Sequence, residues 1–123
     1  MQPSDHALKL LHELAHSAQP VHLVFLLENI SAHLEAIRLA ALKNELLPVD
    51  IAQLIAERLR VLLQDLDGLA AEQQQLVIGA ARYFISTDDE LPDTESVLGL
   101  DDDAAIFNHV AALVGRKDLT IQL

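Results

Sequence analysis

The hydrophobic positions of this chain recur every three or four residues over most of its length, which is the spacing of amphipathic helices. The first such stretch predicts a helix that begins after Ser4 or Asp5 and ends near Ala18. The pair Gln19-Pro20 stops it, because the residue before a proline disfavours helical geometry.

A long helical pattern over residues 21–46 carries a heptad seam, in which apolar residues alternate spacings of four and three. The seam consists of Leu23, Leu27, Ile30, Leu34, Ile37 and Ala41. Such a seam is typical either of a helix inside a bundle or of a coiled coil that joins two chains. We interpret it as a central helix of a bundle, with Asn29 and Ser31 as the positions for any bend.

A third helix is predicted to start after Pro48, where Asp50 and Gln53 form a capping box. It ends at Gly68, because glycine is the usual residue after a helix C-terminus.

The fourth helix is predicted over residues 69–86, and Gly79 would let a neighbouring helix pack closely against it. Its inward side chains are Leu76, Val77, Ala80, Tyr83 and Phe84. The last helix is predicted to begin at Asp102 or Asp103 and to end at Gly115.

These elements predict an all-α fold, a compact bundle of about five helices with an acidic loop before the last one. The length fits a single helical domain over residues 1–123. The tail over residues 119–123 alternates like a strand, but the sequence offers it no evident partner.

The amino-acid composition excludes several classes of protein and of functional site. The chain has no cysteine, which excludes disulfides, thiolate zinc sites and a cysteine nucleophile. Apolar runs such as residues 23–27 are far shorter than a membrane span requires. The N-terminus carries Asp5 and His6 where a signal peptide would be basic. We therefore expect a soluble, cytoplasmic protein.

The charge of the chain is strongly negative and unevenly distributed. The formal net charge is −11, and residues 61–123 carry twelve acids against three basic residues. Such a field repels nucleic acids and anionic membranes, so we expect neither as a partner. With 3% aromatic residues the chain also lacks a stacking platform for single strands.

One short stretch matches a catalytic motif. His12-Glu13-Leu14-Ala15-His16 fits the H-E-x-x-H pattern of zinc peptidases, whose histidines bind zinc and whose glutamate is the general base. Twelve residues leave no room for the substrate-binding strand before it, and no third ligand is recognisable downstream. We interpret the motif as a coincidence and expect neither stoichiometric zinc nor peptidase activity.

The segment over residues 83–106 carries the most informative pattern. Residues 86–103 contain eight acids and no base. The order of its residues resembles the signature of the YkvA-like family, a bacterial domain of unknown function. The matching positions are Tyr83, Ser86, Asp89, Pro92, Asp93, Gly99, Asp102 and Asp103. The resemblance covers about a fifth of the chain.

Three positions depart from that signature. Thr87 stands where the family usually has proline, and Asp88 and Glu90 stand where it usually has apolar residues. Many members of the family look membrane-associated, and their segment at this place in the signature is apolar. The acidic replacements indicate that membrane attachment does not carry over to this chain, and the resemblance implies no agreed biochemical activity.

Two interpretations of this acidic junction are open. In the structural one, Pro92 fixes the loop, Gly99 is left-handed, and Asp102 or Asp103 caps the last helix. In the other, four carboxylates converge on Ca²⁺ or Mg²⁺, which prefer oxygen ligands. The candidate ligands are Asp89, Asp93, Asp102 and Asp103.

The resulting functional hypothesis is a protein-interaction or scaffolding module that needs no cofactor. No nucleophile with a base and an orienting group is evident, which disfavours an enzyme. The alternative is a divalent-cation-dependent binding protein or enzyme that uses residues 88–103. A homodimer is a further hypothesis, because residues 21–47 hold more aliphatic positions than one buried stripe requires. The seam or an adjoining apolar face would form its interface.

Overall fold

The structure is a computed structural model that describes residues 3–16, 23–45, 47–85 and 97–122. They form α1 (Asp5–Ala15), α2 (Leu23–Ala41), α3 (Val49–Gln64), α4 (Ala71–Ile85) and α5 (Val97–Leu113), with short 3-10 helices η1 (Leu66–Gly68) and η2 (Lys117–Leu119). The described residues contain no strand, so the predicted all-α fold is confirmed. The predicted acidic loop before the last helix lies outside these residues.

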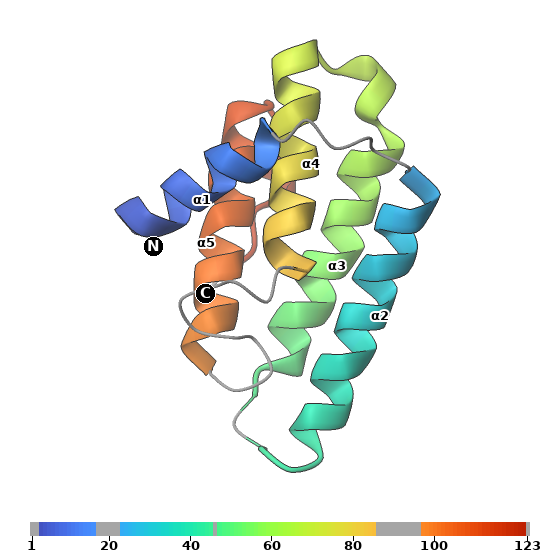
Figure 1. The fold of residues 1–123 in the computed structure, drawn as a ribbon, viewed down its shortest axis with the longest axis vertical. Helices are drawn as coiled ribbons and strands as arrows, with labels where there is room; N and C mark the ends of the chain where they lie inside the picture. The colour runs from blue at the N-terminus through green and yellow to red at the C-terminus, as the bar shows by residue number, and fades with distance from the viewer. Residues whose placement is uncertain (1–2, 17–22, 46, 86–96, 123) are drawn as a thin grey trace.

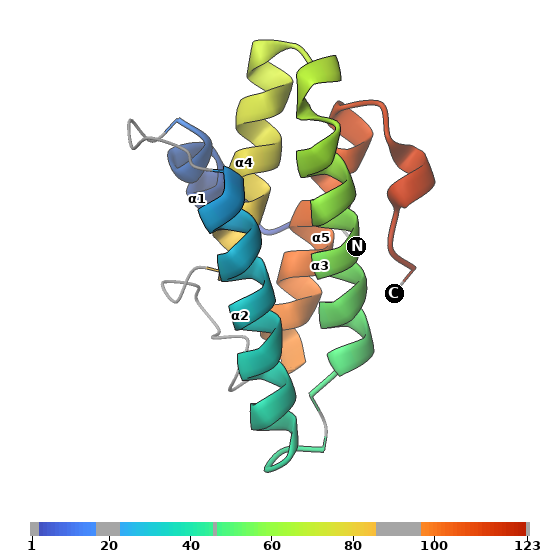
Figure 2. The same cartoon turned by 90° about the vertical axis from the view of Figure 1, so that its right-hand side faces the viewer.

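The helices α2 to α5 run alternately down and up along the long axis of the molecule, and α1 crosses them obliquely (Figure 1). Helix α4 contacts each of the other four helices. Helix α2 packs against α3 and α4 and forms the right-hand edge in Figure 1, while α1 packs mainly on α4. Figure 2 shows the edge formed by α2 from its outer side.

The core draws large side chains from all five helices and from the C-terminal tail. Those that are fully buried are Leu11, Ile30, Ile37, Ile55, Leu59, Leu62, Leu63, Phe84, Ile106, Phe107 and Ile121. Removing such a side chain from water stabilises the fold by about 1.5–3 kcal/mol each before entropy costs. The amphipathic spacing read from the sequence therefore corresponds to a shared core.

The start of the chain follows its local signals. Ser4 caps α1, because its side-chain oxygen accepts a hydrogen bond from the backbone N–H of Ala7 at 3.1 Å. Gly79 lies against Ala15, where α1 crosses α4. A Cβ at Gly79 would lie 2.8 Å from the Cβ of Ala15, so only glycine permits this approach. The predicted close packing at Gly79 is confirmed.

Helix α2 is one continuous helix, with no break at Asn29 or Ser31. The seam faces the interior of its own bundle: Ile30 and Ile37 are buried, and Leu27 and Leu34 pack against the core. The interpretation as a bundle helix is therefore confirmed. The end of the seam at Leu23 is exposed, and Leu26 is buried in its place.

The predicted boundaries of α3 were partly wrong. No side chain caps its N-terminus, and Gln53 contacts Arg38 and Glu57 instead of reaching back to form a capping box. The helix ends at Gln64, and Gly68 belongs to the 3-10 helix η1. Contacts with α2, which a capping rule ignores, decide where the side chain of Gln53 lies.

The start of α5 was also predicted wrongly. The helix begins at Val97, so Gly99 is helical rather than left-handed, and Asp102 and Asp103 lie beyond its first turn and are not caps. The five consecutive residues 103–107 are all buried, which means that neighbouring elements surround this turn. Tertiary packing thus overrides the preference of aspartate for a helix start.

The end of α5 agrees with the prediction. Gly115 has a φ of 76°, in the left-handed region. The N–H of Gly115 donates to the carbonyl of Ala112, and the N–H of Arg116 donates to that of Ala111 at 2.7 Å. This pair of bonds is a Schellman motif, which satisfies carbonyls that the helix end would leave open.

The C-terminal tail has partners that the sequence did not reveal. The side-chain amide of Asn108 bonds both backbone groups of Ile121: it accepts from the N–H at 2.7 Å and donates to the carbonyl at 3.0 Å. Arg58 of α3 donates to the carbonyls of Leu119 and Thr120. The side chain of Ile121 is buried. The tail is therefore held by α3 and α5 without forming a strand.

Candidate functional site

The stretch that matches the zinc-peptidase pattern lies on α1 at the molecular surface. His12, Glu13 and His16 are exposed, and the two imidazole ring centres are 6.3 Å apart. The Nδ1 of His16 lies 2.8 Å from the carbonyl oxygen of His12, and His16 is the residue that ends the helix. Within the described residues, no three potential ligands are grouped so as to hold a metal ion, either here or elsewhere.

The acidic junction is described only at its two ends. Ser86, Asp89, Pro92 and Asp93, four of the predicted site residues, lie outside the described residues. Their convergence with the carboxylates at the start of α5 therefore stays a prediction.

The described members of the junction lie on two helices. Tyr83 is buried near the end of α4, and Gly99 lies within α5. Asp102 is half-buried, whereas Asp103 is only 2% exposed. Among the described residues, Asp103 is the one charged side chain that the core buries. Sequence reasoning placed Asp103 in this segment but assigned it to a helix cap.

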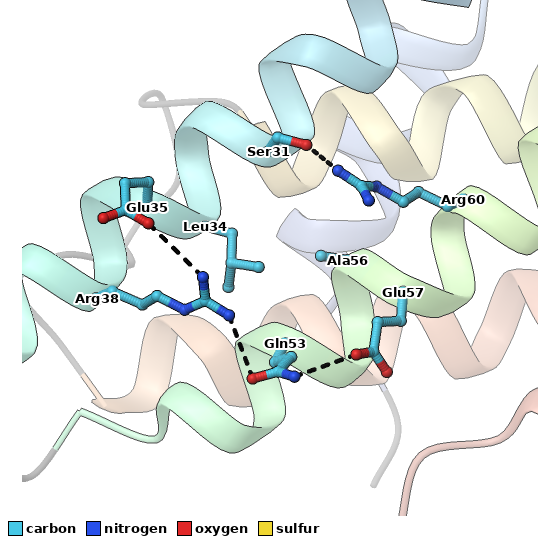
Figure 3. Close-up of a pocket in the computed structure, with 8 residues that line it drawn as sticks. All are labelled: Ser31, Leu34, Glu35, Arg38, Gln53, Ala56, Glu57 and Arg60. Carbon is cyan, nitrogen blue, oxygen red and sulfur yellow. Dashed lines mark hydrogen bonds and ion pairs between the residues drawn. The ribbon is translucent and has the colours of Figure 1, made fainter.

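A groove of about 320 Å³ runs between α2 and α3 (Figure 3). Its lining comes from Ser31, Leu34, Glu35 and Arg38 of α2 and from Gln53, Ala56, Glu57 and Arg60 of α3. Opposite charges alternate around it, because each helix contributes one arginine and one glutamate. The sequence did not indicate this groove, since the residues that bond from α2 to α3 are 15 and 29 positions apart.

The polar side chains of the groove bond to one another within each helix and, at two places, between α2 and α3. Arg38 lies 3.6 Å from Glu35 and donates to the Oε1 of Gln53 at 3.4 Å. Gln53 in turn donates to Glu57 at 3.1 Å. At the other end of the groove, Arg60 donates to the hydroxyl of Ser31 (Figure 3).

This pattern fastens α2 to α3 rather than presenting a reactive group. Both guanidinium groups have acceptors within the groove, and the Ser31 hydroxyl faces Arg60, which is a cation and not a base. Exposed ion pairs of this kind stabilise a fold by about 1 kcal/mol or less. The contribution of the network is to fix the position of α2 on α3.

The outer side of α2 carries exposed apolar side chains beside the exposed acids Glu28 and Glu35. We define the α2 outer face as the exposed apolar residues of α2 after its first residue, Leu23, together with the exposed leucine of the turn that follows. They are Val24, Phe25, Ala32, Ala36, Leu39 and Leu42. Phe25 is 63% exposed, Leu39 57% and Leu42 81%. The large exposed hydrophobic residues of the described chain are concentrated here, since the two others are Leu23, at the start of α2, and Leu113 on α5.

The α2 outer face exists because α2 is apolar on more than one side. Its inner side supplies Leu26, Ile30 and Ile37 to the core. The excess of aliphatic positions noted in the sequence falls on the opposite side, where no described helix lies across it (Figures 1 and 2). Exposed apolar side chains gathered on one helix indicate a candidate site where another protein could bind.

None of the described helices has the length and apolar character that crossing a membrane requires. Comparison of the chain with protein-family models, with curated proteins and with solved structures finds no match.

Proposed function

We propose that this chain is a cytoplasmic protein-interaction or scaffolding module, of the YkvA-like type that residues 83–106 resemble, and that it binds through the α2 outer face. The observation that carries the proposal is the exposure of Val24, Phe25, Leu39 and Leu42 along one edge of the bundle. A partner that covers these side chains removes apolar surface from water, and each fully buried side chain of this size contributes about 1.5–3 kcal/mol.

The way in which α2 is held also supports a binding role. The groove contacts attach α2 to α3, and Ile30 and Ile37 anchor it in the core, so the outer face is presented on a fixed helix. A surface that is ordered before binding loses less conformational entropy when it meets its partner. The bundle then acts as a support for one helical face.

Affinity capture from native lysate, with single substitutions on the purified chain, tests the proposal. Leu39→Asp places a charge at the C-terminal end of the α2 outer face and should abolish capture of the wild-type partner. Leu113→Asp is the matched control, because Leu113 is a 50% exposed leucine on α5, away from that face. Equal capture by wild type and Leu39→Asp would contradict the proposal. Circular dichroism should show the same helical content for all three proteins.

The alternative function is divalent-cation-dependent and uses residues 88–103. The burial of Asp103 supports this alternative function, because a carboxyl inside a core is costly unless specific interactions compensate. The same capture experiment in chelator and in millimolar Mg²⁺ or Ca²⁺ separates the two functions. Binding through the α2 outer face should not change with the cation, whereas a function of the acidic junction should require it.

A further inference from the structure

The α2 outer face has a spacing that suits contact with a copy of itself. Phe25, Ala32 and Leu39 follow one another at intervals of seven residues, and seven residues return a helix to within about 20° of the same direction. Ala36 lies beside this line and is also exposed. The line therefore has a large side chain at each end and small ones in the middle.

This order is self-complementary when two copies of α2 lie antiparallel. If a two-fold axis passes through Ala32, position 25 of one copy lies opposite position 39 of the other, because both positions are seven residues from the axis. Phe25 then meets Leu39 of the second copy, twice, as the symmetry of a two-fold interface requires. Alanine at the centre lets the two helices approach closely, so the large side chains at the ends can make contact.

The distribution of charge along the sequence also favours the α2 segment for self-contact. Two copies of this chain repel one another because each carries a net charge of −11, of which residues 61–123 contribute −9. Residues 23–45 hold three acids, Glu28, Glu35 and Glu45, against two basic residues, Arg38 and Lys43. The segment that carries the α2 outer face is thus nearly neutral within a chain of net charge −11.

From these three observations we infer that the partner of the α2 outer face is a second copy of this chain, bound antiparallel about a two-fold axis near Ala32. The inference rests on the proposed function, since it names the partner of the same surface. Helix α2 is about 28 Å long, which limits the contact to the small end of protein interfaces. We expect a reversible dimer with a dissociation constant in roughly the micromolar range.

Disulfide trapping tests the position of the axis, because the chain contains no cysteine of its own. Ala32→Cys places one thiol at the axis, where two copies bring their Cα atoms to within about 4.4–6.8 Å, as a disulfide requires. The matched control is Ala112→Cys, an exposed alanine on α5. At equal micromolar concentration under mild oxidant, Ala32→Cys should form covalent dimer at least tenfold faster. Equal rates would overturn the inferred arrangement.

Sedimentation equilibrium of the wild type, Leu39→Asp and Leu113→Asp tests the dimer itself. We expect concentration-dependent dimerisation of the wild type and Leu113→Asp and a monomer for Leu39→Asp. A wild type that stays monomeric to several hundred micromolar overturns the inference. If that monomer still captures a different protein through Leu39, only the inference fails, and the proposed function stands. A wild-type dimer that Leu39→Asp leaves intact also overturns the inference, because its interface lies elsewhere.

Discussion

At the scale of the residue, Gly79 allows α1 to lie directly on α4. Substitution Gly79→Ala would bring its Cβ within 2.8 Å of the Cβ of Ala15 and 3.0 Å of its Cα, so the backbone of α1 must shift. Alanine improves helix propensity by about 1 kcal/mol, but overpacking costs about 1–3 kcal/mol. We expect a net loss of about 1 kcal/mol in the free energy of unfolding, measured by urea denaturation.

The control for that substitution is Gly68→Ala. Gly68 has open space around it, and its φ lies outside the left-handed region. Its replacement should leave the free energy of unfolding unchanged or raise it by up to about 1 kcal/mol. If both variants were equally stable, the contact between α1 and α4 would not be as tight as the structure indicates.

Asp103 is the residue at which stability and the alternative function can be separated. Because the buried carboxyl of Asp103 takes part in an interaction that a neutral amide cannot fully replace, Asp103→Asn should lower the free energy of unfolding by about 1–3 kcal/mol. We expect Asp103→Asn to lower the melting temperature by the same amount in chelator as in millimolar Ca²⁺ or Mg²⁺. A wild-type melting temperature that rises with cation, and an Asp103→Asn variant that does not respond, would instead support the cation site.

Single residues also mark what local sequence signals can predict. The start of α1 at Ser4 or Asp5 and the end of α5 at Gly115 were predicted correctly, because a cap and a Schellman glycine depend on backbone groups within about five residues. Gln53 and Asp103 were assigned wrongly to caps, because their positions depend on α2 and on the elements around α5. A pattern along the chain carries no information on such distant contacts.

At the scale of the element, the seam of α2 predicted correctly that this helix belongs to a bundle. It did not predict which additional apolar residues would stay outside, since Leu23 and Leu26 have the same character and only the packing shows that Leu26 is buried. The groove between α2 and α3 was missed for the same reason. Its arginines and glutamates look like ordinary surface residues until the two helices are placed side by side.

The C-terminal tail is the element whose attachment can be tested most directly. Asn108→Ala removes both hydrogen bonds to the backbone of Ile121 and leaves those partly buried groups to find other partners. We expect a loss of about 1–3 kcal/mol in the free energy of unfolding. Asn108→Asp should restore only part of it, because a carboxylate can accept from the N–H of Ile121 but cannot donate to its carbonyl.

Hydrogen exchange gives the second measurement on the tail. In the wild type, the amide of Ile121 should exchange slowly, because it donates to Asn108 at 2.7 Å. In Asn108→Ala it should exchange at least tenfold faster, whereas amides in the middle of α3 should change only by the overall loss of stability. An unchanged Ile121 amide would mean that the tail is held by its buried side chain alone.

At the scale of the whole molecule, the acidic excess and the exposed apolar side chains belong to different parts of the sequence. The acidic excess lies in residues 61–123, while the exposed hydrophobic side chains lie mainly on α2. A chain with net charge −11 resists non-specific association through long-range repulsion. Two copies can then associate only through a surface where the free energy of apolar burial exceeds that repulsion. This restriction makes even a weak interface selective.

This balance predicts how salt acts on the inferred dimer. The range of electrostatic repulsion falls from about 30 Å at 0.01 M salt to about 8 Å at 0.15 M, whereas apolar burial is little affected. The dissociation constant should therefore decrease, by roughly three- to tenfold, when NaCl is raised from 0.02 M to 0.3 M in sedimentation equilibrium. Leu39→Asp should stay monomeric throughout, which controls for general salting-out. A dimer that weakens with salt would be held by ion pairs and would contradict an apolar interface on α2.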